Sequence, residues 1–437
     1  MSDSFSIRID YDKVLLVLFY LYAFSMPFEL ILDIEFGIDT IFKPFRVLSL
    51  LIIGVYGLKI LRQGIYLKSD YHHDLALYGV FIYGLLISLF RMMDGIFQFG
   101  LFLNDTFQVG LHVATFFIFK ATHFRTEQMM WIMRCFVFGI ALNSLYIFYD
   151  FFIFGHHGRQ SGYTDNPNYS SLGLVAAMTY LLLRLDRIKK FWYQVLFSLV
   201  FLFFLYIFII VGSRTGLVIF LLSNVFLFAF YSFRRKLALS FLVGVFVLML
   251  LPEQLERVSI GGGPLVLFTR IHKNLESGEE DVRFIIWRGV FRALETEGYA
   301  GMGIGQFKAN FPHYFNEEYH KLVLDMVNYG YYLSTHNDYL ALLTDYGLPA
   351  LLCYLVFLYV AFRKIFRRLL LQETDPQRRF LYQLNFILFV GLTVFGLAAE
   401  NFQHQLYWFL LAFTTSKAAF ENEPQALASE GALSPAT

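Results

Sequence analysis

Three consecutive polar residues, His336-Asn337-Asp338, stand near the end of the longest polar stretch between two apolar runs of the chain. An imidazole titrates close to neutral pH, so it can take a proton from a hydroxyl group. Ser334 or Thr335 can cap a helix that begins here, and a helix N-terminus attracts anions and lowers the pKa of a nearby imidazole. A lone His at a helix start is more often structural than catalytic, but these polar neighbours favour a role in proton transfer.

Arg214 is the first cation that could work with this imidazole. It lies between two apolar runs, beside Gly212, Ser213 and Gly216. Small residues let the backbone approach a ligand and leave room for a bulky anion. A guanidinium group stays protonated and matches phosphate oxygens with its fork of N–H donors. The alternative is an arginine that snorkels from a helix end to the membrane surface.

Arg283 is the second such cation, and it opens the segment 281–294. Apolar residues in this segment recur at helical spacing, which predicts an amphipathic helix in a polar loop. Arg283 projects beyond the apolar stripe. Arg288 and Arg292 lie four residues apart on one face; a solvated face or attraction to anionic lipid is the favoured explanation for Arg292 and one of two open explanations for Arg288.

Two further motifs in the same stretch are only weak signals of a nucleotide or metal site. The run 301–307 reads Gly-Met-Gly-Ile-Gly-Gln-Phe, but no strand precedes it, so a tight turn is favoured over a dinucleotide site. The adjacent acids Glu279, Glu280 and Asp281 do not converge on an ion, so we interpret them as a solvated charge run and expect no metal or cofactor.

Composition defines the class of protein. Of 437 residues, 57% are hydrophobic and only 16% are charged, whereas a soluble domain carries about 25% charged residues. Apolar runs of about 20 residues recur, each long enough to cross a bilayer as a helix. The net charge of +1 gives no sign of a nucleic-acid partner. Cys135 and Cys353 lie inside apolar runs, which favours packing over a disulfide or zinc site.

The sequence therefore predicts an all-α polytopic membrane protein with about twelve spans. We expect spans near 13–32, 45–62, 74–93, 98–119, 128–154, 169–185, 191–211, 214–233, 236–251, 346–362, 379–398 and 402–416. The first is read as a retained helix rather than a cleaved signal peptide. Asn104 and Asp105 interrupt the fourth, so that helix is expected to kink or to face a polar cavity.

Lys and Arg residues concentrate in alternate short loops, which predicts that both termini lie in the cytoplasm. The chain then divides into nine spans in 1–251, a large outer loop in 252–345 carrying amphipathic helices, three spans in 346–416 and a polar, disordered tail in 417–437. His336, Arg214 and Arg283 all fall on the outer side. The loop 159–168 and Glu400 fall on that side too, although a turn and a helix start explain the loop equally well.

In combination, these motifs resemble the O-antigen ligase and polymerase superfamily of bacterial membrane glycosyltransferases of the GT-C type. The resemblance covers roughly 155–405. The motifs that carry it are Asn-Pro-Asn at 166–168, Gly-Ser-Arg-Thr-Gly at 212–216, Arg283 with Trp287, Gly-Met-Gly-Ile-Gly-Gln-Phe at 301–307 and His-Asn-Asp-Tyr-Leu at 336–340.

The resemblance implies a metal-independent, inverting transfer of a glycan from undecaprenyl diphosphate at the periplasmic face of the inner membrane. It implies that Arg214 and Arg283 hold the diphosphate and that His336 acts on the acceptor hydroxyl. The acceptor would be lipid A core or a second lipid-linked glycan, with membrane lipids around the protein. The expected substrate-binding residues are Arg159, Asn168, Arg288, Gln306, Asn337, Asp338, Tyr339 and Glu400.

Two branches remain open within this reading. A ligase transfers finished polymer to lipid A core, and a polymerase joins the growing chain to a new lipid-linked repeat. The His-Asn-Asp-Tyr-Leu cluster favours a ligase slightly. A different class, a transporter or flippase of lipid-linked sugars, would need ionisable residues in mid-span and repeat symmetry. Few polar or ionisable residues lie in mid-span, namely Glu29, Arg134 and the Asn104-Asp105 pair, so they give little support to the transporter alternative.

Overall fold

A computed structural model describes residues 10–29, 43–64, 72–155, 160–164, 166–230, 282–315, 334–370, 373 and 375–416. Within these ranges all regular structure is helical, and it comprises 14 α-helices with a 3-10 turn and a π-helical turn. The all-α class expected from the apolar runs is therefore confirmed.

Each expected span except 236–251, which lies outside the described residues, coincides with a helix. These helices are α1 (Tyr11–Ser25), α2 (Pro44–Gln63), α3 (His72–Arg91), α4 (Phe99–Ala121), α5 (Thr126–Phe152), α6 (Pro167–Leu185), α7 (Phe191–Val211), α8 (Arg214–Phe230), α16 (Leu348–Leu370), α17 (Pro376–Phe395) and α18 (Gln405–Thr414). The remaining elements are α12 (Val282–Glu297), α13 (Gln306–Asn310), the 3-10 turn η1 (Phe311–Tyr314), α15 (Asp338–Ala341) and the π-helical turn η2 (Leu342–Tyr346).

Six of the described helices are long and apolar enough to cross a membrane, namely α2, α3, α4, α5, α7 and α16. The count of about twelve spans therefore remains an expectation. One expected span is shorter than its apolar run suggests. The ten residues of α18 extend about 15 Å, about half of the hydrocarbon core of a bilayer, because the chain does not enter this helix until Gln405.

Local sequence fixes the helix ends that lie near one another at the candidate site. The Asn166 side chain accepts a hydrogen bond from Asn168 N, and Pro167 follows at the first helical position of α6. Gly212 ends α7 in the left-handed conformation, and α8 begins two residues later. The N-terminal ends of α6 and α8 are thus set by short, sharply defined turns.

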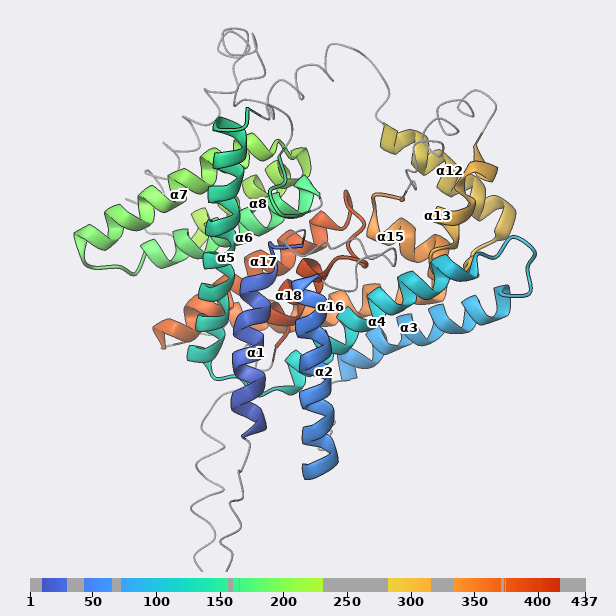
Figure 1. The fold of residues 1–437 in the computed structure, drawn as a ribbon, viewed down its shortest axis with the longest axis horizontal. Helices are drawn as coiled ribbons and strands as arrows, with labels where there is room; N and C mark the ends of the chain where they lie inside the picture. The colour runs from blue at the N-terminus through green and yellow to red at the C-terminus, as the bar shows by residue number, and fades with distance from the viewer. Residues whose placement is uncertain are drawn as a thin grey trace, which may run out of the picture.

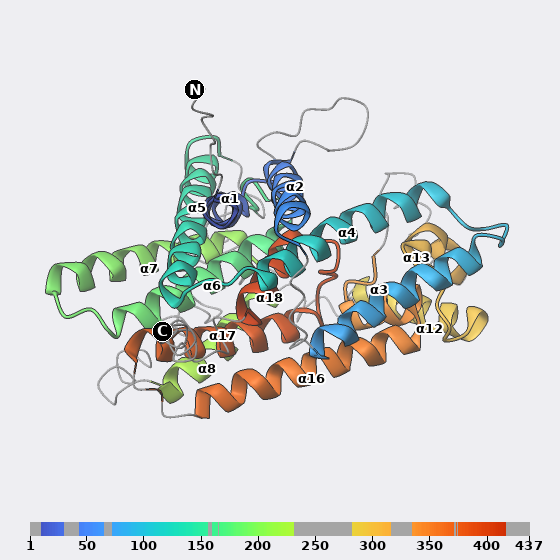
Figure 2. The ribbon, with the colours of Figure 1, turned by 90° about the horizontal axis from the view of Figure 1, so that it is seen from below.

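The C-terminal helices occupy the centre of the molecule. α16 packs along α3, and α17 packs against α18, α8 and α6. Figure 2 shows α16 and α3 side by side, with α17 and α18 behind them. α4 runs without a break through Asn104 and Asp105, and its Asp105 is buried against the α17–α18 connection. Asp105 therefore makes a polar contact in the protein interior, whereas Asn104 is exposed.

The segment 282–315 has a small hydrophobic core of its own. α12 buries one face, consistent with the expected amphipathic helix, and packs against α13 and η1. The core residues are Ile286, Val290, Ala293, Leu294, Met302, Phe307, Phe311 and Tyr314. Phe284 and Phe291, two other apolar residues of this segment, are exposed. In Figure 1 this unit lies at the upper right, above α3 and α4.

Backbone hydrogen bonds join this unit to the start of α16. Met302 N donates to Thr344 O at 2.8 Å and Gly303 N donates to Asp345 O at 2.9 Å. The crossing is so close that a Cβ on Gly347, whose φ is +86°, would lie 2.2 Å from Ala300 O. The Gly-x-Gly-x-Gly run is therefore a tight turn that packs backbone against backbone, as favoured from the sequence.

We expect Gly347→Ala to destabilise the protein by roughly 3 kcal/mol or more, because both the positive φ and the steric clash act against it. Gly64 also has a positive φ, +79°, but a Cβ added there would meet no atom within 4 Å, so Gly64→Ala isolates the cost of the conformation. The measurement is thermal unfolding of the purified variants in detergent. Equal melting temperatures for the two variants would contradict the close crossing.

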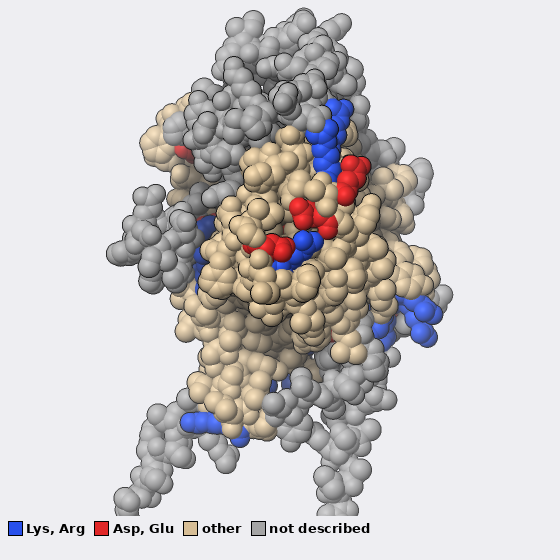
Figure 3. Space-filling model, turned by 90° about the vertical axis from the view of Figure 1, so that its right-hand side faces the viewer, with Lys and Arg blue, Asp and Glu red and all other residues tan. Residues whose placement is uncertain are grey.

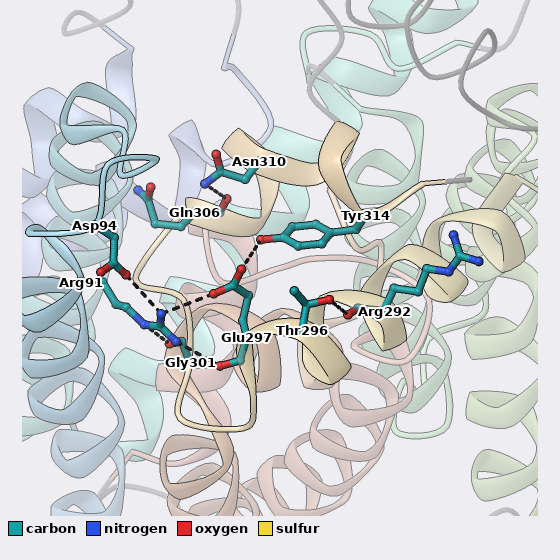
Figure 4. Close-up of polar contacts among 9 residues, drawn as sticks. All are labelled: Arg91, Asp94, Arg292, Thr296, Glu297, Gly301, Gln306, Asn310 and Tyr314. Atoms are coloured by element: carbon teal, nitrogen blue, oxygen red, sulfur yellow. Dashed lines mark hydrogen bonds and ion pairs between the residues drawn. The ribbon is translucent and has the colours of Figure 1, made fainter. Parts of the chain in front are cut away.

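An ion-pair network holds the same unit to α3. The Arg91 guanidinium bonds to Gly301 O at 3.2 Å and Glu297 O at 3.1 Å, and pairs with Asp94 at 3.1 Å. Glu297 also accepts from the Tyr314 hydroxyl at 3.3 Å, as Figure 4 shows. Figure 3 looks onto this end of the molecule, where acidic and basic side chains lie side by side on an otherwise mainly uncharged face. Arg91 thus fixes the segment 282–315 against α3.

Candidate functional site

His336 has a backbone conformation that non-glycine residues seldom adopt. Its φ is +50°, and it is the one non-glycine residue with positive φ in the described ranges. Thr335 bridges across it, because its Oγ1 donates to Asn337 O at 2.8 Å and accepts from Asn337 N at 3.3 Å. The strained residue is therefore held from both of its neighbours, and its half-buried side chain is displayed between them.

The connection between α17 and α18 supports this turn from one side. Glu400 Oε2 accepts a hydrogen bond from Thr335 N at 3.0 Å and lies 3.2 Å from Thr335 Oγ1. Asp338 N donates to Gly396 O at 2.7 Å, and the buried Asp338 carboxylate accepts from both the backbone and the side-chain amide of Asn401. Residues 396–401 thus fix the position of the His336 turn.

The next two residues are also committed to structure. The Asn337 side chain, and not Ser334 or Thr335 as expected, caps α15 by accepting from Tyr339 N at 2.9 Å and Leu340 N at 3.1 Å. Its amide donates to Leu397 O at 3.0 Å. The Tyr339 hydroxyl donates to Thr393 O on α17 at 2.9 Å. The side chains of Asn337 and Tyr339 therefore hold the His336 turn in place and do not project from it.

α12 approaches the turn from a second side. The Trp287 indole donates to Thr335 O at 3.0 Å. Arg283 lies four residues before Trp287 on α12, and side chains four apart share one face of a helix. The face of α12 that carries Arg283 is therefore the face that meets the His336 turn. Arg288, one residue past Trp287, is exposed.

The N-terminal ends of α6 and α8 approach from a third side. Ser213 Oγ donates to Asn168 Oδ1 at 2.9 Å, so the residue before Arg214 is attached to the start of α6. The Tyr169 hydroxyl, one residue further, donates to Glu400 O. Arg214 is thus joined to the His336 turn through α6 and Glu400. The three principal residues predicted from the sequence lie on elements that meet at Glu400 and Thr335.

Of the remaining predicted residues, Gln306 falls elsewhere. Arg159 lies outside the described residues. Gln306 is buried, and its side-chain amide bonds to Gln98 N at 2.8 Å and Gln98 O at 3.2 Å. It holds α13 to the start of α4. In the Gly-rich motif 301–307, Gln306 therefore has a structural role.

Sequence reasoning missed the role of Asp345 beside this turn. Its carboxylate accepts from Gly305 N at 3.1 Å and Phe307 N at 2.9 Å, which caps α13 across the backbone crossing. Together with Gly305, Glu400 and Gln403 it lines a small cavity with room for about one water molecule. An acid in the sequence Leu-Leu-Thr-Asp-Tyr carries no local sign of such a distant partner.

Burial perturbs the acids around the turn. It raises the pKa of Asp338 to about 8, against the hydrogen bonds from Asn401 that lower it. Burial also raises the pKa of Asp345 well above its ordinary value. The pKa of Glu400 is raised by burial and by the neighbouring Asp105 carboxylate, while the Lys308 ammonium and the Thr335 donors oppose this rise. Lys308 is thus a further cation near the site that the sequence did not single out.

Asp338 should give the folded protein a pH dependence of definite sign. Because its pKa is about 8 in the fold and about 4 in an unfolded chain, the folded state binds more protons between these values. Stability therefore falls as pH rises from about 4 to about 8. We expect Asp338→Asn to remove this part of the fall in melting temperature, measured in detergent across that range. An unchanged pH profile in the variant would contradict a buried, protonated Asp338.

No three His, Cys, Asp or Glu side chains in the part of the chain that the structure describes gather closely enough to hold a metal ion. The acidic run 279–281 lies outside it.

A protein-family model described as O-antigen ligase matches residues 199–355. This membrane protein therefore carries an O-antigen ligase domain over residues 199–355. The match includes most of α7 and all of α8, α12, α13 and α15, and therefore Arg214, Arg283 and His336. It confirms the resemblance stated from the sequence motifs. The family comprises ligases and polymerases that transfer lipid-linked glycans, and the match does not separate these two activities. No match was found among curated proteins.

Asn168 and Glu400, which complete the support of the turn, lie outside the matched segment. The contacts among α6, the α17–α18 connection and the turn therefore extend the candidate site beyond the segment that matches the O-antigen ligase model.

Proposed function

We propose that this protein is a glycosyltransferase that moves a glycan from undecaprenyl diphosphate to an acceptor hydroxyl at the periplasmic face of the bacterial inner membrane. The first choice of acceptor is lipid A core, which makes the protein an O-antigen ligase. The alternative is an O-antigen or exopolysaccharide polymerase of the same family.

One observation carries this proposal. Thr335 bonds to Glu400 at 3.0 Å and to Trp287 at 3.0 Å, so the turn that displays His336 is held where α12 and the α17–α18 connection meet. α12 carries Arg283, and the Tyr169 contact with Glu400 adds the end of α6 beside Arg214. An imidazole near two arginine-bearing elements supports transfer from a diphosphate, because it offers a base for the acceptor and cations for the leaving group.

The chemistry follows from the properties of these groups. In the proposed reaction, the acceptor oxygen attacks the anomeric carbon from the face opposite the diphosphate, and the bond from that carbon to the diphosphate oxygen breaks. His336 takes the proton from the acceptor hydroxyl. Arg214 and Arg283 neutralise the negative charge that builds up on the departing diphosphate. Since the diphosphate is already a good leaving group, positioning and charge supply most of the rate, and no metal is invoked.

The other proposed residues have supporting roles. Asn337, Asp338, Tyr339 and Glu400 hold the turn through the contacts described above, so we assign them to positioning. Asn168, Arg159 and Arg288 remain proposed contacts to the glycan or diphosphate. We leave Gln306 out of the substrate-binding set because its amide is used between α13 and α4.

The proposal is tested with the purified full-length protein in detergent. Donor glycan on undecaprenyl diphosphate should be transferred to lipid A core without a sealed vesicle, and EDTA should not change the rate. Activity that appears only in sealed vesicles as movement of uncleaved donor would favour a transporter. Loss of transfer in EDTA that a divalent ion restores would overturn the metal-free mechanism.

A deletion strain distinguishes ligase from polymerase. If the protein is a ligase, polymer accumulates on the lipid carrier and the core remains unmodified. If single repeat units cap the core instead, the protein is a polymerase. The readout is the size distribution of surface and carrier-linked polysaccharide.

A further inference from the structure

A cavity of about 690 Å³ lies between the ends of α8, α16 and α17. Its volume is within the range of about 300–1,000 Å³ typical of small-molecule sites. The walls are mainly apolar and are formed by Phe226, Ala229, Phe230, Phe366, Leu369, Leu370 and Phe386. Four of the seven are phenylalanines, which suits a hydrocarbon chain better than a polar ligand.

This cavity is separate from the candidate transfer site. Its lining on α16 begins at Phe366, about 27 Å along the helix from Leu348. Its lining on α8 begins at Phe226, about 18 Å from Arg214. Figure 2 shows the far ends of α8, α16 and α17 gathered at the lower left, away from α12 and α13. A ligand here would not contact the His336 turn.

The cavity has a polar edge with an excess of positive charge. Arg368 and Arg379 line it with a single acid, Glu373. The Glu373 carboxylate accepts a hydrogen bond from Asp375 N at 3.1 Å, so part of its capacity is used within the chain. Arg187 adds a third guanidinium next to this edge, bonded at 3.3 Å to Gln383, which also lines the cavity. An anion is therefore favoured at the edge.

Tyr382 supplies an independent sign of a ligand. Its side chain lines the cavity and is only 4% exposed, yet its hydroxyl has no hydrogen-bond partner among the described residues. Buried hydroxyl groups nearly always find a partner. A phosphate oxygen held by Arg368 or Arg379 would accept this hydrogen.

We propose that this cavity binds an anionic phospholipid. One acyl chain lies against the phenylalanines of α8, α16 and α17. The headgroup phosphate lies at the edge, where Arg368 and Arg379 pair with it and the Tyr382 hydroxyl donates to it. Because the arginines outnumber the acid, a phosphatidylglycerol headgroup fits better than a zwitterionic one.

Native mass spectrometry of the purified full-length protein tests the proposal. Phosphatidylglycerol and phosphatidylethanolamine with the same acyl chains are titrated separately, and inorganic phosphate is titrated as a third probe. We expect phosphatidylglycerol to bind about tenfold more tightly than phosphatidylethanolamine, as expected for one charge-assisted contact. Equal binding of the two lipids overturns the headgroup assignment, and phosphate that competes fully with lipid overturns the lipid assignment.

Matched variants locate the binding. Arg368→Gln with Arg379→Gln should remove the preference for phosphatidylglycerol, and Tyr382→Phe should weaken binding several-fold. Arg367 lies on the same helix as Arg368, but its side chain is exposed and does not line the cavity. Arg367→Gln should therefore keep wild-type binding. If Arg367→Gln is as damaging as the double variant, general surface charge explains the result and the cavity assignment fails.

A second pair of variants tests the apolar part. Ala229→Phe adds a ring at a residue that lines the cavity, whereas Val225→Phe adds one a turn earlier on α8, at an exposed residue that does not line it. We expect Ala229→Phe to reduce binding of both lipids about tenfold or more while Val225→Phe leaves it unchanged. Melting temperatures show that both variants are folded. Undiminished lipid binding by a folded Ala229→Phe variant contradicts the proposal.

Discussion

Replacing His336 by Ala is expected to lower the rate of glycan transfer by about 10²–10⁴-fold, the usual contribution of a general base. The physical reason is that the acceptor hydroxyl would then have no group to take its proton. The measurement is kcat of the purified protein with saturating donor and acceptor. Expression and melting temperature should remain close to those of the wild type, because the side chain is half-buried and its support comes from its neighbours.

The unusual backbone of His336 requires a control of its own. Asn tolerates positive φ better than Ala does, so His336→Asn keeps the turn while removing the base. We expect His336→Asn to be as inactive as His336→Ala. His313→Ala, which changes an exposed imidazole on η1, should retain wild-type kcat. An active His336→Asn variant would mean that the turn, and not the imidazole, is what transfer needs.

Replacing Arg283 or Arg214 by Ala is expected to lower kcat/KM for the lipid-linked donor by about 10²–10³-fold, in line with the loss of one group that stabilises developing charge. Lys at either position should restore only part of the activity, because an ammonium group cannot form the two parallel hydrogen bonds of a guanidinium fork. The test is a comparison of donor kinetics for the Ala and Lys variants.

Arg292 provides the matched control, since it lies on α12 with Arg283 but nine residues later along the helix. Arg292→Ala should leave donor kinetics unchanged. Full activity of both Lys variants would show that a point charge is enough. A loss for Arg292→Ala as large as that for Arg283→Ala would indicate that α12 contributes general positive charge rather than a specific contact.

The helices could be predicted from the sequence because apolar runs and caps are local signals. The expected spans overlap helices wherever the structure describes them, and Asn166-Pro167 marks a helix start at the expected place. The cap of α15 is Asn337 rather than Ser334 or Thr335. The length of a helix was less predictable than its position. The apolar run at 402–416 gives only the short α18, because His404 caps the helix late by accepting from Leu406 N.

Contacts between distant residues could not be predicted in the same way. Thr335 and Glu400 are 65 residues apart, and Gln98 and Gln306 are separated by 208. Periodicity identifies the buried face of a helix but not the residue that it meets. Gln306 was therefore assigned to substrate from its motif, whereas packing gives it a structural role. Asp345 was overlooked because its partners lie across a backbone crossing.

That crossing has a practical consequence for exchanging parts between members of the family. Residues 299–303 and 344–348 hydrogen-bond to each other through backbone groups, with Leu348 N donating to Tyr299 O at 2.9 Å. A chimaera that grafts the segment 282–315 from a homologue but keeps the native start of α16 would join two surfaces that did not evolve together. Grafts intended to change acceptor choice should therefore extend through residue 348, so that both sides of the seam come from one parent.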